Sequence, residues 1–297
     1  MLKTERMDRV RAALRAQGLT QMIVCDPKSV WYLTGVAVEP YERLLALYLP
    51  TEGEPVLFLN RLFNVPEPPC RTVWHTDTDK PVAQIAEVVD AGRPLGIDKE
   101  WPAKFLIPLM EAHPGMQVVL SSDCVDDCRA CKDAEEQTLM REASRINDAV
   151  NEAAKHYIKA GMTEREVAEF IDAQYRAHGC EGPSFTTIVS FGANAADPHH
   201  EPDDTVLKEG DCVLFDMGCV KSRYCSDMTR TWFCGQPTEK HAAVHDLVRR
   251  ANEAAEALIM PGVRLCELDA AARDLITEAG YGAYLSLIHI AEPTSPE

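Results

Sequence analysis

Apolar positions in residues 1–120 alternate between the spacing of a helix and that of a strand. Residues 5–18 repeat at helical intervals and stop at Gly18, and the short apolar run 22–25 is typical of a buried strand. The same pattern predicts strands at 44–49, 55–59, 95–98 and 118–120, and helices at 82–89 and 105–112. This alternation predicts an α/β domain with a mixed sheet over residues 1–125.

Helical spacing returns in a longer stretch beyond a polar, acid-rich segment, which we interpret as a linker at 126–133. Residues 134–159 predict one long amphipathic helix. Thr163 and Glu166 have the spacing of a capping box, so a further helix is expected to begin there. Strands are then expected around 185–189, 213–215 and 229–233, followed by two helices that end near residues 260 and 278. A second domain is therefore predicted at 134–284.

Two neighbouring strands of this second domain carry one aspartate each. If their turn centres on Lys221 and Ser222, Asp216 lies directly opposite Asp227 on the same face, with Cβ atoms roughly 5 Å apart. Two carboxylates in an apolar ribbon repel each other and are costly to desolvate, which favours a divalent metal ion between them. The alternative is that one aspartate caps a turn while the other pairs with a neighbouring arginine.

Composition excludes several classes of partner. The 297 residues include 30 basic and 47 acidic side chains, a net charge of −17 that argues against nucleic acid and anionic membranes. No apolar run approaches the roughly 18 residues of a membrane span, and the N-terminus lacks the apolar core of a signal peptide, so a cytoplasmic location is expected. The eleven scattered cysteines are expected to be reduced. Cys128 and Cys131, and His241 and His245, have metal-ligand spacings, but without further ligands we favour ordinary structural roles.

Several motifs in the second domain resemble those of the M24 metallopeptidases, the family of Xaa-Pro dipeptidase (prolidase) and aminopeptidase P. They are Asp216-Met-Gly, the eleven-residue interval to Asp227, and the Met-Thr-Arg-Thr that follows. The upstream Pro198-His199 also resembles a segment of that family, and the similarity extends over residues 6–284. The resemblance implies a creatinase-type N-terminal α/β domain followed by the first part of a pita-bread catalytic domain.

The same resemblance implies a chemistry for these residues. Asp216 and Asp227 would be two of five protein ligands to a pair of divalent ions, which could be Mn, Co or Zn. His199 would be the catalytic residue that lies beside the ions and helps to position substrate. The substrates would be short proline-containing peptides cleaved at the Xaa-Pro bond, by either a dipeptidase or an aminopeptidase P. The enzyme would be a homodimer.

The residues after Tyr284 depart from the family's pattern. There the resemblance implies a Gly-His-Gly segment with the third ligand and two later glutamates as the fourth and fifth. The chain instead offers His289, Glu292 and Glu297 in unmatched contexts. We therefore expect residues 285–297 to be foreign to the ancestral protein, and the chain to be a C-terminally truncated and inactive form.

Two other functions stay open at this point. One is creatinase-like hydrolysis of a small amide or guanidino compound without metal, which retention of both aspartates disfavours. The other is a non-catalytic relative that binds proteins.

Overall fold

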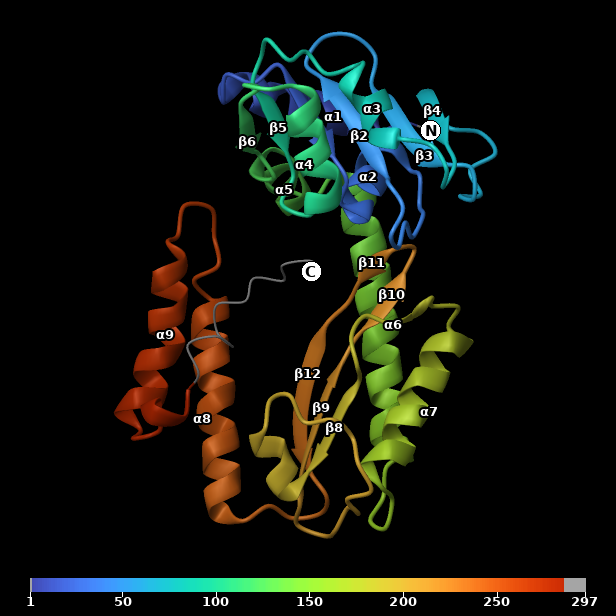
Figure 1. Ribbon diagram of the computed structural model, residues 1–297. Coiled ribbons are helices and arrows are strands. Elements are labelled where there is room, and N and C mark those ends of the chain that lie inside the picture. Colours follow the sequence, from blue (N-terminus) through green and yellow to red (C-terminus); the bar gives the residue numbers. More distant parts are fainter. Residues whose placement is uncertain (1, 286–297) are drawn as a thin grey trace. The chain divides into compact units, whose positions relative to one another are not determined.

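The structure of the protein is a computed structural model that describes residues 2–285. It divides into two compact units between Asp133 and Ala134, each built from helices and strands (Figure 1). The α/β class predicted from the sequence is confirmed in both. Within the described residues, no helix has the length and apolar content needed to cross a bilayer.

The first unit is a six-stranded mixed sheet covered by helices on both faces. Its strands are β1 Gln21–Val24, β2 Ala46–Pro50, β3 Val56–Asn60, β4 Arg71–His75, β5 Leu95–Ile97 and β6 Val118–Leu120, in the spatial order β4-β3-β2-β1-β5-β6. Its helices are α1 Thr4–Ala16, α2 Pro27–Thr34, α3 Pro81–Ala86, α4 Ala103–Ala112 and α5 Asp123–Ala130. Two apolar clusters fill its core, one beneath α1, α2 and α5 and the other beneath α3 and α4.

Three elements of this unit have no counterpart in the sequence pattern: α2, β4 and α5. The Asp26 side chain caps α2 by accepting hydrogen bonds from the backbone of Lys28 and Ser29, and Gly35 ends the helix at φ 75°. Only eight residues long, α2 shows too little helical periodicity to be recognised. α5 covers 123–130, most of the stretch expected as a linker, and contributes the buried side chains of Cys124 and Val125 to the first core cluster.

The second unit combines two long helices, two small sheets and a pair of C-terminal helices. Its helices are α6 Ala134–Tyr157, α7 Glu164–Ala177, α8 Glu239–Glu256 and α9 Leu265–Glu278, with short 3-10 turns η1 Gly192–Ala196 and η2 Gly282–Tyr284. Its strands are β7 Gly182–Pro183, β8 Ile188–Phe191, β9 Cys212–Met217, β10 Cys219–Lys221, β11 Tyr224–Cys225 and β12 Met228–Phe233. The sheets have the orders β12-β9-β8 and β11-β10-β7.

The predicted capping box is confirmed at the start of α7. Thr163 Oγ1 accepts from the Glu166 N–H at 3.2 Å, and the Glu166 carboxylate accepts from the Thr163 N–H at 2.8 Å. In Figure 1, α6 and α7 lie on one side of β8, β9 and β12, whereas α8 and α9 pack on each other. The core beneath α6 and α7 includes Val213, Phe215 and Met217, three alternate residues of β9.

A buried hydrogen-bond chain joins both of these helices to β9. Tyr175 of α7 donates to Asn147 Oδ1 of α6 at 2.6 Å, and Asn147 Nδ2 donates to the Met217 carbonyl at 3.0 Å. Tyr175 and Asn147 are 0% and 1% exposed, so water does not compete for these bonds. The backbone next to Asp216 is thereby held by side chains from two helices.

We expect Tyr175→Phe to lower the free energy of unfolding by about 1–3 kcal/mol, because it leaves the buried Asn147 oxygen without its donor. Urea unfolding followed by circular dichroism measures the change. Tyr157→Phe is the matched control, because Tyr157 is 39% exposed and stacks on Phe170; its effect should stay within about 0.5 kcal/mol. Equal effects of the two substitutions would contradict the role given to the buried chain.

Candidate metal centre

The ribbon formed by β9 and β12 does not have the predicted register. Asp216 lies opposite Thr229, so the direct pairing of Asp216 with Asp227 is wrong by two residues. The turn centres on Ser222 and Arg223, at φ 51° and 67°, one position later than predicted. Two-residue turns of this kind need positive φ at both positions and usually show it as Asn-Gly or Asp-Gly. Ser-Arg carries no such signal, so the sequence could not place the turn.

The face of the ribbon that carries Asp216 opens into a cavity. Leu214 and Thr231 pair across the strands on this face, and both line a cavity of about 980 Å³ that residues of α8 also border. Because side chains two residues apart share a face, Asp216 lies on the same side as Leu214. Thr229 and Asp227 line the same cavity. The two aspartates therefore share one face, but diagonally, with Cβ atoms roughly 7 Å apart rather than 5 Å.

A glycine sets the path of the ribbon beside the aspartates. Gly218 follows β9, and a Cβ there would collide with the Ser226 carbonyl oxygen and with Ser184 Oγ. Ser184 Oγ donates to that carbonyl at 2.8 Å, and the Ser184 N–H donates to the Gly218 carbonyl at 3.0 Å. These contacts hold the chain that leads into Asp227 close against the end of β9.

The donor set of the ribbon fits a hard divalent cation. Thr229 Oγ1 donates to Asp216 Oδ1 at 2.9 Å, which orients the carboxylate, and Asp216 Oδ2 meets no donor among the described residues. Asp227 is exposed on the cavity wall. Carboxylate groups on a face that opens into a cavity can bind Mn²⁺, Co²⁺ or Zn²⁺, and a cation would relieve their mutual repulsion.

His199 lies in the segment that connects η1 to β9. Its side chain is exposed, and its N–H donates to Asp197 Oδ1 at 3.0 Å. Ala195 of η1, four residues before His199, lines the cavity together with Asp227. The structure thus brings η1, which precedes this segment, to the cavity wall.

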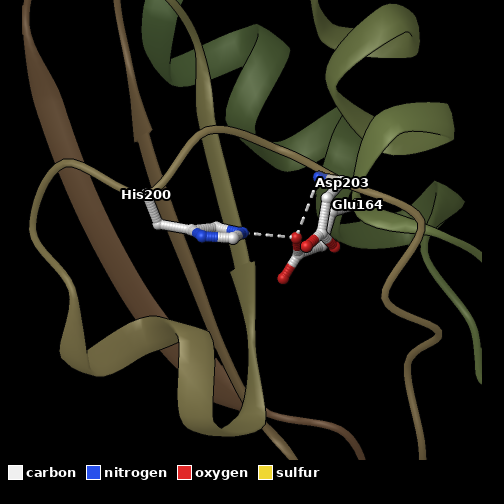
Figure 2. Close-up of side chains that lie close together, drawn as sticks. All are labelled: Glu164, His200 and Asp203. Carbon is white, nitrogen blue, oxygen red and sulfur yellow. Dashed lines mark hydrogen bonds and ion pairs between the residues drawn. The ribbon is translucent and has the colours of Figure 1, made fainter.

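A second group of acid and imidazole side chains, which sequence analysis missed, lies at the start of α7. Glu164, His200 and Asp203 place ligand atoms within 4.8 Å of one another (Figure 2). The Glu164 carboxylate, however, accepts four hydrogen bonds, from the N–H groups of Phe191 and Asp203 and from the side chains of Asn194 and His200. Donors that fill both oxygens leave no lone pair for a cation, so we interpret this group as a hydrogen-bond network.

Comparison with known proteins identifies the family. The model of metallopeptidase family M24 matches residues 138–290, and that of the creatinase/prolidase N-terminal domain matches residues 6–131. The chain belongs to metallopeptidase family M24. An uncharacterized peptidase of Staphylococcus epidermidis is 32% identical over 93% of this chain and 79% of its own length.

Solved structures agree with this membership of M24. A prolidase from Thermococcus sibiricus superposes with a TM-score of 0.88 at 30% identity, over 96% of this chain and 80% of the prolidase. An Xaa-Pro dipeptidase from Bacillus anthracis superposes with a TM-score of 0.84 at 26% identity, over 94% and 79%. The creatinase-type domain followed by a pita-bread domain is therefore the fold of this M24 peptidase chain, as the resemblance implied.

The other candidate sites of this M24 chain have ordinary environments. Burial raises the pKa of the Cys128 thiol, which makes it a poor ligand or nucleophile at neutral pH, and its candidate partner Cys131 is exposed. His241 and His245 pack on Phe233, and no third ligand joins them in residues 2–285.

We expect Gly218→Ala to destabilise the M24 domain by about 1–3 kcal/mol, because the new methyl group collides with backbone that cannot move without shifting the ribbon. Urea unfolding measures the loss. Ser222→Gly, in the turn of the same ribbon, should be neutral or stabilise by up to about 1 kcal/mol, because glycine adopts the positive φ at no steric cost. A Gly218→Ala variant as stable as the parent would show that the close approach of Ser226 does not constrain the chain.

Proposed function

We propose that the paired aspartates bind divalent metal ions and that the site hydrolyses Xaa-Pro peptide bonds of short proline-containing peptides. One observation carries the proposal: Asp216 and Asp227 share one face of the ribbon, and that face opens into the cavity. Membership of M24 supports metal-dependent peptidase chemistry. Similarity to a prolidase and to an Xaa-Pro dipeptidase supports the choice of bond.

Each residue has a physical task in this proposal. Metal ions held by Asp216 and Asp227 would polarise the substrate carbonyl and lower the pKa of a bound water. Thr229 fixes the orientation of Asp216 through its hydroxyl. His199, which is exposed, would donate a hydrogen bond to a bound carbonyl and so orient the peptide.

The ligand count limits what this chain does by itself. The family resemblance implies five protein ligands, and among the described residues Asp216 and Asp227 are the two that match. Two carboxylates cannot satisfy a pair of metal ions, each of which needs three or more protein groups for tight binding. We therefore propose that the 297-residue chain binds metal weakly and releases proline too slowly to detect.

A Mn²⁺ titration followed by electron paramagnetic resonance tests the metal ligands. We expect Asp216→Asn and Asp227→Asn each to weaken Mn²⁺ binding by about tenfold or more, because each removes a charged ligand. Asp269→Asn on α9 is the control; Asp269 pairs with Arg273 at 2.9 Å, away from the ribbon, and its loss should leave Mn²⁺ binding unchanged.

Two outcomes would contradict the proposal in different ways. If neither aspartate substitution changes Mn²⁺ binding, Asp216 and Asp227 are not metal ligands, and a non-catalytic binding role is favoured. Rapid release of proline from Ala-Pro by the unmodified chain would support Xaa-Pro peptides as the substrate. It would also refute the proposal that this chain has too few metal ligands for detectable hydrolysis.

Thr229→Val should weaken Mn²⁺ binding by roughly tenfold, because hydrogen bonds that orient a metal ligand contribute about that much to metal affinity. Thr231→Val provides a matched control: Thr231 lies two residues further along the same face of β12 and pairs with Leu214 rather than with a carboxylate. The same titration compares them. Similar losses in the two variants would mean that the Asp216 hydrogen bond has no specific effect.

A further inference from the structure

The segment that carries His199 is fastened to the first turn of α7 by one buried side chain. Glu164 is 0% exposed, and its Oε1 accepts from the Phe191 N–H at 2.7 Å and from Asn194 Nδ2 at 3.0 Å. Its Oε2 accepts from the Asp203 N–H at 3.1 Å and lies 2.6 Å from His200 Nε2. One carboxylate therefore holds the start, the middle and the end of residues 191–203.

The hydrogen-bond roles in this network follow from counting donors. Asn194 Nδ2 has two hydrogens, and it lies 3.0 Å from Glu164 Oε1 and 3.1 Å from Thr205 Oγ1, which together accept both. No hydrogen of Asn194 remains for His200 Nε2, 3.1 Å away. His200 Nε2 must therefore carry its own hydrogen and donate it to Glu164. Figure 2 shows the ring of His200 pointing from the segment toward Glu164.

This network fixes the backbone on both sides of His199. His200 is tied to Glu164, and the His199 and His200 N–H groups donate to the Asp197 side chain and carbonyl at 3.0 and 3.3 Å. We propose that Glu164 and His200 are positioning residues, whose hydrogen bond fixes the backbone of His199, four residues after the cavity-lining Ala195. This inference rests on the proposed function for the task of His199, but the anchoring itself does not depend on catalysis.

Nuclear magnetic resonance of the full chain with labelled histidines tests the anchoring, with His199→Gln assigning the His199 signal. In Glu164→Gln we expect the Phe191 and Asp203 amides to exchange with solvent at least tenfold faster, and the His199 ring signals to shift or broaden. Glu166→Gln is the matched control: it makes the same chemical change two residues later, in the exposed capping box. It should leave the amide exchange of Phe191 and Asp203 and the His199 signals as in the parent.

A second pair of variants covers the case in which Glu164→Gln does not fold. His200→Gln keeps an N–H donor that reaches toward Glu164, whereas His200→Leu does not. The His199 signals should remain nearer to those of the parent in His200→Gln than in His200→Leu. Equal shifts in both, or a folded Glu164→Gln variant with parental His199 signals and amide exchange, would overturn the proposal.

Added Mn²⁺ and Ala-Pro separate this inference from the proposed function. In the parent chain, saturating Mn²⁺ should broaden the His199 ring signals, and Ala-Pro should shift them further. In Glu164→Gln both effects should weaken at least twofold, while the affinity for Mn²⁺ stays within twofold of the parent. Undiminished effects in Glu164→Gln would overturn the positioning role. A parent chain whose His199 senses neither addition would refute the proposed function, and the amide-exchange comparison would then decide the anchoring alone.

Discussion

Strand alternation is the constraint on which the site depends. Val213, Phe215 and Met217 are buried beneath α6 and α7, so the intervening residues of β9, among them Asp216, must face the cavity. A slip of one residue would bury an aspartate and expose three large apolar side chains, at a cost of several kcal/mol in desolvation and lost burial. The hydrophobic core thereby determines the side of the sheet on which a metal ion can bind.

This constraint explains which part of the site the sequence predicts. The alternation of Val213 and Phe215 with polar neighbours is visible in the sequence, so the face of Asp216 needed no knowledge of the turn. The face of Asp227 was inferred from the turn, and it was right because the register differs from the predicted one by an even number of residues. The direct pairing of the two aspartates depended on the position of the turn. That pairing was wrong, because Ser222 and Arg223 adopt positive φ although neither is the Asn, Asp or Gly that usually indicates such a turn. Backbone strain that is supported by surrounding contacts leaves little trace in local sequence.

The same distinction holds for the fold. Long periodic segments such as α6, and α7 with its capping box, were predicted within a few residues, because amphipathic spacing and caps are local signals. α5 was not predicted as a helix, since its polar sequence shows little periodicity and it is stabilised by packing Cys124 and Val125 on the first core. Glu164 was missed for a related reason. An acidic residue in the first turn of a helix is common, and only the fold brings Phe191, Asn194 and His200 to it.

The structure holds its two site-bearing segments by similar means. Asn147 and Tyr175 form a buried hydrogen-bond chain to the Met217 carbonyl, next to Asp216, and Glu164 collects donors from the segment around His199. Buried polar groups are costly unless they are fully hydrogen-bonded, but when satisfied they specify one arrangement more sharply than apolar packing does. Because Tyr175 and Glu164 both belong to α7, a displacement of that helix would disturb both segments together. The position of α7 therefore links the stability of the core to the geometry of the metal site.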